Sequence, residues 1–362
     1  MNILFAMCSW GLGHAARDLP LIRRLLELQH QVTVVGIGRS LRFVQQELGG
    51  SCSYQECADY VPAYSNKAFS VVRFTGRFPL YMKEVAQEHR HIETLVNRHG
   101  FDRIVSDSRF GVYHPAIPSY LIFHQLRYIV PGRIGILERV TEGVNRRLSR
   151  RYQKILVPDV EDASNNLSGE LSHGVHYFKP EQIVYLGLLC DMNKRDVVQD
   201  IDCFISISGP EPQRTQLEKK VLAQVGLLRG KIVVTLGKPE DRRRDTTGNV
   251  TVYGCLGRKQ QEEMMNRARM IVTRPGYTTI MELAVLGRKA LFIPTPGQTE
   301  QLYLAEYHFQ KANFYRVTQD ALNLPEDIER AKEYYGVHLD KVLPCEAESR
   351  FIQTVVGKKD RP

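Results

Sequence analysis

The sequence has few cysteines and no long apolar run, and each absence excludes a class of protein. It contains 362 residues and seven cysteines, which are scattered and form no Cys-x-x-Cys pair. An odd, scattered set is typical of reduced thiols in the cytosol rather than of a disulfide framework. No run reaches the roughly 18 apolar residues that a transmembrane helix needs, and the first residues lack the basic region and cleavage site of a signal peptide. We therefore expect a cytoplasmic protein.

Low-complexity tracts and short-period repeats are also missing, which leaves an ordinary globular composition. Hydrophobic residues make up 43% of the chain and charged residues 25%, a balance that argues against disorder. A length of 362 residues favours two domains, each large enough to bury its own core.

Apolar runs alternate with segments of helical periodicity along the first half of the chain. Such alternation predicts βαβ units and a parallel sheet. Strands are expected at residues 3–7, 32–35, 104–105, 120–123, 155–157 and 183–186, and helices at residues 15–28 and 40–48.

A polar stretch at residues 191–196 interrupts this pattern and is our candidate hinge. The alternation then restarts, which predicts a second α/β half. Its strands are expected at residues 203–207, 232–236, 250–253, 270–273 and 290–293. Two similar halves predict two Rossmann-like, doubly wound domains that face each other across a cleft. Ligands of such sheets bind beyond the carboxyl ends of the strands.

The most informative segment is Arg274-Pro-Gly-Tyr-Thr-Thr-Ile-Met-Glu282, which lies between two of these apolar runs. A turn at Gly276 should leave the strand and begin a helix over residues 277–286. The first amides of a helix are unpaired and carry partial positive charge, so they suit an anion such as a diphosphate. Glu282 lies one to two turns into the helix, where its carboxylate is placed to accept hydrogen bonds from a ribose diol.

Glu300 and Gln301 begin the next helix, where polar side chains are placed to hold sugar hydroxyls. The joint spacing of Gly276, Glu282, Glu300 and Gln301 closely resembles the nucleotide-sugar site of GT-B glycosyltransferases. The resemblance is strongest to the glycosyltransferase 28 group, which includes the N-acetylglucosaminyltransferase of peptidoglycan lipid synthesis. It covers most of the chain, with its specific part at about residues 270–305.

The resemblance implies a GT-B fold and a division of labour between the domains. Residues 1–190 would form the acceptor-side domain and residues 196–340 the donor domain, and a helix in residues 341–362 would pack back onto the first domain. The implied reaction moves a sugar from a nucleotide diphosphate, with UDP favoured, to an unidentified hydroxyl, with inversion at the anomeric carbon. A lipid-linked or cell-envelope acceptor would suit this group. The nucleotide sugar is a substrate, so no cofactor is expected, and enzymes of this type generally act without a bound metal.

A glycine-rich loop, Gly11-Leu-Gly13-His14, follows the first strand. The glycines permit a tight turn and a close approach of substrate to the backbone. His14 falls at the start of the next helix, where the positive end of the dipole disfavours imidazolium. A neutral His14 can accept a proton from an attacking hydroxyl. In the resembled family, a histidine in such a loop activates the acceptor or stabilises the site; a simple capping or loop histidine is the alternative.

The same loop also matches a dinucleotide fingerprint, Gly11-x-Gly13-x-x-Ala16. That fingerprint needs an acid after the second strand, whereas this chain has Arg39, which would suit the 2′-phosphate of NADP. An NADP-dependent oxidoreductase is therefore an alternative. A sugar-nucleotide hydrolase, an epimerase and a non-catalytic sugar-nucleotide sensor are others.

Polar side chains also follow two later strands of the first half. Asp107 is placed to contact the acceptor or to orient His14, and a plain Asx turn is the alternative. His124 and Gln125 are placed to line the acceptor side together with the glycine loop. The segment Ser-Asp107-Ser-Arg109-Phe-Gly, with His124-Gln125, is similar to an uncharacterised archaeal and bacterial branch of GT-B-like proteins.

Two loops of the second half provide further donor-side candidates by resemblance. Gly209 would bring backbone close to the diphosphate, although two prolines and Glu211 depart from the Gly/Ser-rich loop of the family. Arg214 would supply positive charge there, unless it is simply solvated. The backbone from Tyr253 to Leu256 would meet the nucleotide base, unless it is an ordinary loop.

Three residues around the informative segment have two interpretations each. Arg274 either contacts the diphosphate or forms a structural ion pair. Thr278 and Thr279 either donate to phosphate or cap the helix.

No metal is expected, because Asp200-Ile-Asp202 precedes its strand and so lies at the wrong end of the sheet.

The net charge of +9 is concentrated in residues 133–154, where apolar residues also recur at helical spacing. This segment is either the solvated face of a core-packed helix or a surface that rests on anionic lipid. No nucleic-acid-binding motif is present, so nucleic acid is not an expected partner. The basic residues are Arg133, Arg139, Arg146, Arg147, Arg150, Arg151 and Lys154, and the apolar ones are Ile134, Leu137, Val140, Val144 and Leu148.

Overall fold

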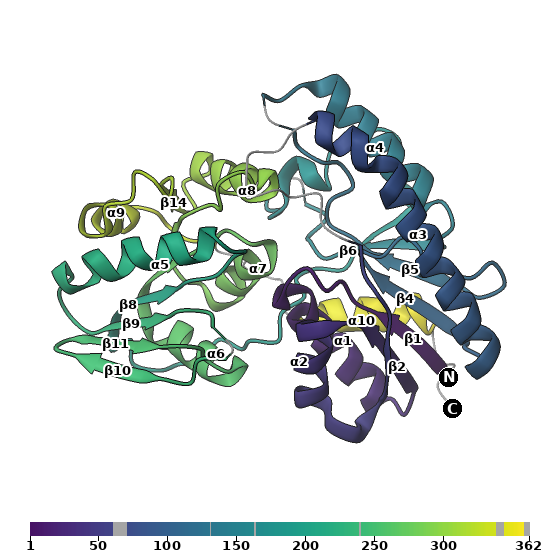
Figure 1. Ribbon diagram of the computed structural model, residues 1–362, viewed down its shortest axis with the longest axis horizontal. Helices are drawn as coiled ribbons and strands as arrows, with labels where there is room; N and C mark the ends of the chain where they lie inside the picture. The colour runs from purple at the N-terminus through teal and green to yellow at the C-terminus, as the bar shows by residue number, and fades with distance from the viewer. Residues whose placement is uncertain (61–70, 131, 163, 239, 338–343, 358–362) are drawn as a thin grey trace. The chain divides into compact units, whose positions relative to one another are not determined.

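The computed structural model describes residues 1–60, 71–130, 132–162, 164–238, 240–337 and 344–357. The chain forms two compact units (Figure 1). Unit 1 runs to Asp191 and also contains the last helix, whereas unit 2 begins at Met192. The polar stretch at 191–196 has no regular secondary structure. Among the described residues, no helix combines the length and the apolar content that crossing a membrane requires.

Unit 1 is built on a sheet of parallel strands in the order β3-β2-β1-β4-β5-β6-β7. All but the edge strand β3 are largely apolar, because helices cover both faces of the sheet. The strands are β1 (Asn2–Ala6), β2 (Gln31–Gly36), β3 (Ser53–Glu56), β4 (Arg103–Asp107), β5 (Ser119–Ile122), β6 (Lys154–Val157) and β7 (Ile183–Tyr185).

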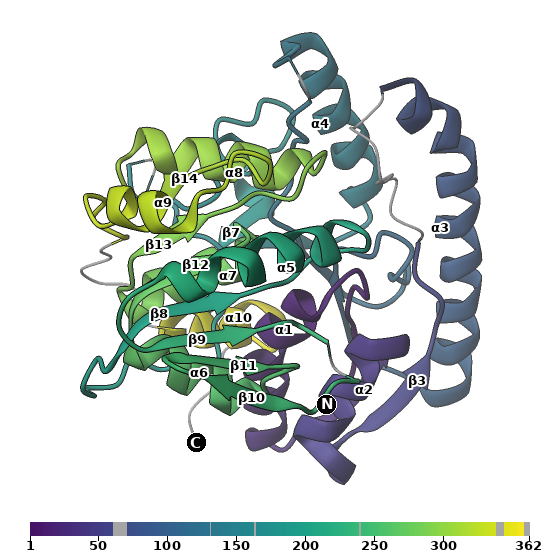
Figure 2. The same ribbon diagram turned by 60° about the vertical axis from the view of Figure 1, so that its left-hand side comes forward.

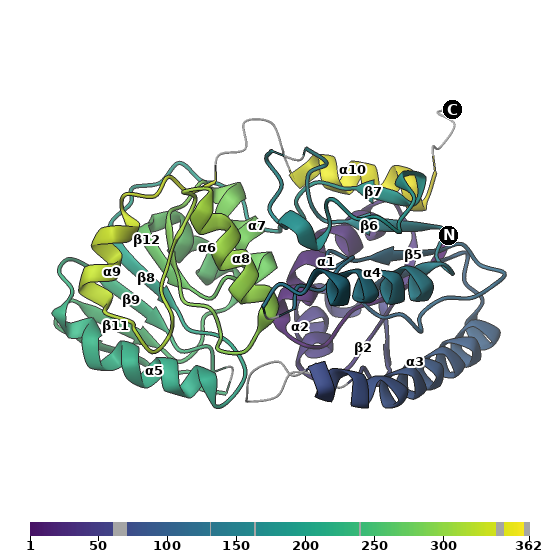
Figure 3. The same cartoon turned by 90° about the horizontal axis from the view of Figure 1, so that it is seen from above.

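Helices cover both faces of this sheet (Figure 3). On one face lie α3 (Val71–His99) and α4 (Gly135–Ser149), and on the other lie α1 (Leu12–Glu27), α2 (Gly38–Leu48) and α10 (Pro344–Val355). The last helix packs on α1 and on the sheet, where the Phe351 ring lies 6.4 Å from that of Phe5. The sequence analysis missed α3, because Gly76 and Pro79 interrupt its pattern.

Unit 2 repeats the plan with the order β10-β11-β9-β8-β12-β13-β14, in which only the β10–β11 hairpin is antiparallel among the described strands. The strands are β8 (Ile201–Ser206), β9 (Ile232–Thr235), β10 (Arg244–Thr247), β11 (Val250–Tyr253), β12 (Ala268–Thr273), β13 (Ala290–Phe292) and β14 (Tyr315–Arg316). The helices are α5 (Gln213–Gln224), α6 (Arg258–Arg267), α7 (Tyr277–Leu286), α8 (Thr299–Gln310) and α9 (Leu324–Ala331). Helices α5 and α9 share one face of this sheet, and α6 and α7 the other (Figure 2).

Strand order fixes where a ligand can bind in each unit. In unit 1 the direction of winding reverses between β1 and β4, which pair with Ala6 opposite Ser106. In unit 2 it reverses between β8 and β12, which pair with Ser206 opposite Thr273. The loops that leave adjacent strands in opposite directions open a crevice at the carboxyl edge. These reversals lie next to His14 and Asp107 in unit 1, and next to Gly209 and Arg274 in unit 2.

Candidate functional site

His14 and Asp107 meet at the reversal point of unit 1. His14 lies in the first turn of α1 and Asp107 ends β4, and the His14 Nδ1 atom is 2.7 Å from Asp107 Oδ2. Asp107 is fully buried, whereas the His14 side chain remains 20% exposed. The predicted contact between these two residues is therefore present in unit 1.

A buried arginine, Arg17, holds the other side of Asp107. Its Nε donates to Asp107 Oδ2 at 3.1 Å, and its Nη2 donates to Oδ1. Burial by itself would raise the pKa of Asp107, but Arg17 and His14 outweigh burial and hold this pKa well below its usual range. Asp107 is therefore a carboxylate, so the His14 Nδ1 that faces it carries a proton. The Nε2 atom of a neutral His14 then has a lone pair, as a general base requires.

His124 and Gln125 lie beside this cluster but are buried, with 4% and 8% of their surfaces exposed. His124 Nδ1 is 3.3 Å from Arg17 Nη1. Asn145 of α4 donates to the backbone carbonyl of Gln125, which fixes the segment that follows β5. Both residues thus belong to the His14 cluster, and their small exposure limits direct contact with an acceptor.

The tight turn expected in the glycine loop is absent. Gly11 has extended backbone with φ 173°, and a Cβ built on it would meet nothing within 4 Å. Gly13 lies inside α1. The fold does not need glycine at position 11, and the open space beside it suits an incoming ligand.

Arg274 organises the loops at the reversal point of unit 2. It is 1% exposed and donates to four backbone carbonyls and to the Gln319 side chain. The expected ion pair is absent: no carboxylate of the described residues pairs with Arg274. Burial lowers its pKa to about 10, so Arg274 remains charged near neutral pH. Directly before α7 there is consequently a buried positive charge with no counter-ion in the described chain. The carbonyls belong to Ser208, Gln213, Ile293 and Pro294.

A buried hydroxyl lies beside that charge. The Thr295 Oγ1 atom is buried and has no hydrogen-bond partner among the described residues. A Cβ built on Gly209 would lie 3.5 Å from Thr295 Oγ1 and 3.8 Å from Arg274 Nε, and the φ of Gly209, +116°, favours glycine. Gly209, Thr295 and Arg274 therefore lie close together, and the predicted contacts of Gly209 and Arg274 with a diphosphate remain predictions.

The first turn of α7 has no side-chain cap. Its N-cap residue is Gly276, whose φ of −69° is ordinary. Thr278 and Thr279 lie inside the first turn and not at the N-cap position itself.

Glu282 forms an ion pair that the sequence analysis did not anticipate. Its Oε1 lies 2.7 Å from Nη2 of Arg258, and both side chains are largely buried. Arg258 begins α6, so the pair joins α6 to α7. The Glu282 carboxylate is therefore held in one orientation.

The role expected for Arg214 is not supported by the structure. Arg214 is buried and forms ion pairs with Glu211 and Glu218, so its charge is already neutralised.

Gln301 is also buried, and its Oε1 accepts a hydrogen bond from the Thr295 backbone at 2.8 Å. This side chain holds the loop rather than pointing into solvent.

The remaining donor-side candidates are partly exposed. Glu300 lies in the first turn of α8. Tyr253 ends β11 next to the hairpin, where Arg244 lies over its ring at 5.5 Å, and Leu256 follows in the loop before α6. The two aspartates of the Asp-x-Asp segment form ion pairs with Arg267 and Arg269. Within the described chain, no three His, Cys, Asp or Glu side chains cluster as metal ligands.

The basic helix α4 presents an unusual outer face. It buries polar residues and leaves Ile136 exposed at 73%. Two members of the expected core-packed stripe, Ile134 and Val140, are also exposed, at 46% and 58%, so the core-packed interpretation is wrong at these positions. The polar residues bind loops: Glu142, for example, accepts hydrogen bonds from the backbone of His176 and Tyr177. The buried set is Glu138, Thr141, Glu142, Asn145 and Ser149.

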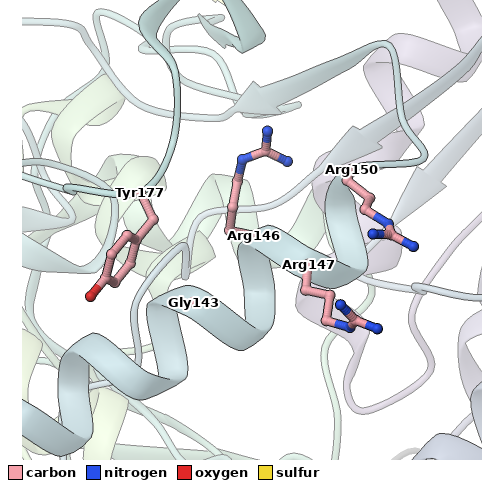
Figure 4. A pocket seen from close by; sticks show the side chains of 5 residues that line it. All are labelled: Gly143, Arg146, Arg147, Arg150 and Tyr177. Carbon is pink, nitrogen blue, oxygen red and sulfur yellow. The ribbon is translucent and has the colours of Figure 1, made fainter.

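Because the acids of α4 are turned inward, its outer arginines lack counter-ions. Arg139, Arg146, Arg147 and Arg150 form no ion pair with any described residue. With Gly143 and Tyr177, the last three line an open hollow of about 410 Å³. Figure 4 shows their guanidinium groups pointing in different directions instead of converging on one point. This arrangement fits an extended anionic surface better than a single ion.

The sequence analysis did not identify three residues of these sites: Arg17, Arg258 and Thr295. Arg17 follows His14 by three positions, so helical spacing alone places the two on one face. Arg258 begins α6, where its side chain reaches a carboxylate on another helix, and no local pattern indicates such a pair. Thr295 lies in a Pro-Thr-Pro-Gly loop, which the sequence analysis did not consider.

Comparisons with known proteins agree with this geometry. Residues 213–333 match the glycosyltransferase family 28 C-terminal domain. An uncharacterised glycosyltransferase of Methanopyrus kandleri is 25% identical over 289 residues, which cover 74% of this chain and 78% of that protein. A second, of Methanosarcina acetivorans, is 23% identical and covers 83% of this chain and 81% of its own.

The chain is a glycosyltransferase with the GT-B fold, and its second unit is similar to glycosyltransferase family 28. Among solved structures, the calicheamicin glycosyltransferase CalG4 is similar with a TM-score of 0.61 at 15% identity, over 96% of this chain and 91% of that one. MurG of Acinetobacter baumannii has a TM-score of 0.54 at 11% identity, over 99% of both chains. The predicted GT-B fold and the predicted glycosyltransferase class are confirmed.

Proposed function

We propose that this glycosyltransferase transfers a sugar from a UDP-sugar to a hydroxyl acceptor, with unit 2 binding the donor and His14 of unit 1 acting as general base. The assignment of the base rests on one observation: His14 is partly exposed, and its Nδ1 is hydrogen-bonded to Asp107. The observation that carries the donor site is the unneutralised Arg274 beside the unpartnered Thr295 hydroxyl.

In the proposed step, His14 Nε2 takes the proton of the acceptor hydroxyl as its oxygen attacks the anomeric carbon. The bond between that carbon and the diphosphate oxygen breaks, and UDP leaves with the electron pair. Attack from the face opposite the leaving group inverts the configuration. The charge that develops on the diphosphate is balanced by Arg274, the first amides of α7 and the Thr295 hydroxyl.

The ribose of the donor is assigned to Glu282. Arg258 holds its carboxylate, so the acceptor atoms for a diol are oriented before the ligand arrives. Orientation in advance lowers the entropic cost of binding. Tyr253 and Leu256 are assigned to the base, and Glu300 to the sugar hydroxyls.

A ligand screen tests the donor assignment directly. Thermal unfolding is measured with UDP, other nucleoside diphosphates, their sugars and NADPH. A ligand present at 100 times its dissociation constant adds about 2.7 kcal/mol of stability. Stabilisation by UDP and UDP-sugars is expected. Stabilisation by another nucleotide family alone would contradict the UDP assignment.

Product analysis separates transfer from its alternatives. The UDP-sugar that stabilises the protein is incubated with and without candidate acceptors, and the anomeric configuration of the product is read by NMR. An inverted glycoside that forms only with acceptor supports the proposal. Free sugar at the same rate in both reactions would indicate a hydrolase, and an altered UDP-sugar an epimerase.

We also propose that the outer face of α4 rests on anionic phospholipid. Four arginines without counter-ions lie beside exposed Ile136 and Val140, which is the composition of a surface that binds both headgroups and acyl chains. A lipid-linked acceptor would be presented at such a surface.

A further inference from the structure

Arg17 contacts the carboxylate partner of one histidine of unit 1, His14, and the ring of a second, His124. It is 1% exposed and follows His14 on α1 by about one turn. Two of its nitrogens donate to Asp107, which binds His14, and the third, Nη1, lies 3.3 Å from Nδ1 of His124. One guanidinium group therefore connects the two imidazole rings.

The protons of the two rings are fixed by what each Nδ1 faces. A guanidinium group has only N–H donors and no lone pair. The Nδ1 atom of His124 must therefore accept from Arg17, and the proton of a neutral His124 resides on Nε2. His14 is the opposite case, because its Nδ1 faces a carboxylate oxygen at 2.7 Å and carries the proton.

We propose that Arg17 is a positioning residue that holds His14 and His124 in opposite tautomers. His14 then presents a lone pair at Nε2 and accepts protons, whereas His124 presents an N–H at Nε2 and only donates. This inference rests on the proposed role of His14 as base. It assigns His124 to the ordering of the site rather than to catalysis.

The same logic sets the orientation of the Gln125 side chain. Its amide nitrogen lies 3.4 Å from Nε2 of His124, and two N–H groups cannot bond each other. The two ends of a glutamine amide exchange places on a half-turn, which brings Oε1 to the His124 N–H. Arg17 thereby orders a series of hydrogen bonds in which it donates to Asp107 and to His124, and His124 donates to Gln125.

The test is the tautomer of each ring in the full-length protein without substrate. Histidine is labelled with nitrogen-15, and two-bond proton–nitrogen correlation spectra at neutral pH distinguish Nδ1–H from Nε2–H. Signals are assigned with His14→Gln and His124→Gln. We expect Nδ1–H for His14 and Nε2–H for His124. The same tautomer in both rings, or a His124 that carries both protons, would overturn the proposal.

Arg17→Met extends the test to function, with Arg109→Met as its matched control. Arg109 is equally buried in unit 1 but pairs with Glu88 at 2.6 Å. Arg17→Met should abolish the Nε2–H preference of His124 and lower kcat at least about tenfold without changing UDP affinity. Arg109→Met should leave both histidine signals unchanged. A folded Arg17→Met protein with wild-type tautomers would contradict the inference.

Failure of this inference is distinct from failure of the proposed function. The wild-type spectra need no substrate and decide the tautomers even if neither variant folds. A His14→Ala protein with undiminished transfer would refute the general base and leave the spectra unaffected. Arg17→Lys adds a rescue test: one ammonium group keeps the charge but cannot hold both Asp107 and His124, so it should restore folding without restoring the His124 tautomer.

Discussion

At the scale of single residues, the two units use buried arginines in different ways. Arg17 is neutralised by Asp107 and gives direction to a histidine. Arg274 has carbonyl and amide partners instead, so its charge remains for a ligand. A charge that is already paired binds an incoming anion weakly, which is why Arg214 is a poor phosphate ligand despite its position.

His14→Ala should lower the rate of transfer by about 10²–10⁴, because the attacking hydroxyl loses its general base. UDP affinity should remain near wild type, since the donor is assigned to unit 2. Transfer is measured with the acceptor identified in the product screen, and UDP binding by calorimetry. His91→Ala, an exposed histidine of the same unit, is the control. A folded His14→Ala protein with the wild-type rate would make His14 a loop residue only.

Thr295→Val should weaken UDP binding by about 1.5–3 kcal/mol, the range for a hydrogen bond to a charged group. It should not lower stability, because the hydroxyl has no described partner to lose. Thr273→Val is the matched control: that hydroxyl bonds the Arg274 carbonyl at 3.4 Å, so its loss should affect folding and not UDP. Calorimetry and chemical denaturation measure the two effects. Equal UDP affinity in Thr295→Val and wild type would remove this hydroxyl from the site.

Glu282→Gln should weaken UDP binding by about 1.5–3 kcal/mol, since the ribose loses a charged acceptor. Arg258→Gln breaks the same ion pair but retains the carboxylate. It should therefore weaken UDP binding less, while lowering stability by a similar amount. If the two variants weaken UDP binding by the same amount, Glu282 affects UDP binding only through its ion pair with Arg258.

At the scale of elements, α4 shows how a helix can be turned by its neighbours. Its sequence carries an apolar stripe, yet the loops that follow β5 and precede β7 need hydrogen-bond partners, and Thr141, Glu142 and Asn145 supply them. Satisfying buried backbone groups outweighs burying Ile136 and Val140, because an unpaired buried amide costs about 1–3 kcal/mol. The apolar and basic side chains are left outside.

The lipid surface of α4 predicts a specific charge dependence. Arg147→Gln with Arg150→Gln should lower binding to phosphatidylglycerol vesicles roughly 25-fold, at about 1 kcal/mol per arginine near the bilayer. Binding should also fall as salt rises. The control, Arg229→Gln with Arg242→Gln, makes the same change of net charge at exposed sites of unit 2. Co-sedimentation measures both. Equal loss in the two pairs would indicate attraction by net charge alone.

At the scale of the whole molecule, a buried carboxyl links the site to global stability. Asp18 is fully buried, and neither of its oxygens accepts a hydrogen bond from a described residue. Burial, and then the nearby charge of Asp107, raise the pKa of Asp18 well above its usual value. A raised folded-state pKa contributes stability that is present below the unfolded-state pKa of about 3.9 and is lost as pH rises towards the folded-state value.

Asp18→Asn should therefore stabilise the protein increasingly as pH rises. The difference from wild type should be near zero at about pH 4 and should grow by up to about 1.4 kcal/mol per pH unit above that. Chemical denaturation from pH 4 to 8 measures it. Asp320→Asn, at an exposed position, should show no such slope. A constant difference between Asp18→Asn and wild type across this range would show that Asp18 is ionised in the folded chain.

Much of the fold follows from local pattern. Short apolar runs between polar turns are typical of buried strands, and helix α7 begins at Tyr277 and ends at Leu286 as its sequence predicts. Parallel strands then bring the residues after each carboxyl end to one edge, so Asp107 beside His14 was predictable. Helix α3 was not, since Gly76 and Pro79 oppose a helix that packing on the sheet sustains.

The sequence by itself determined which strand ends and helix starts carry the candidate sites, because strand and helix periods are local properties of the chain. Only the tertiary structure decided how each charge is used. Arg17, Arg214 and Arg274 look alike in the sequence. Arg17 and Arg274 acquire their roles from partners between 19 and 107 positions away, and Arg214 from a neighbour one turn along its helix. Burial removes water as a competing partner. The nearest carbonyl or carboxylate therefore decides whether the charge of a guanidinium group is neutralised by the protein or is left to bind a ligand. No local pattern records that choice.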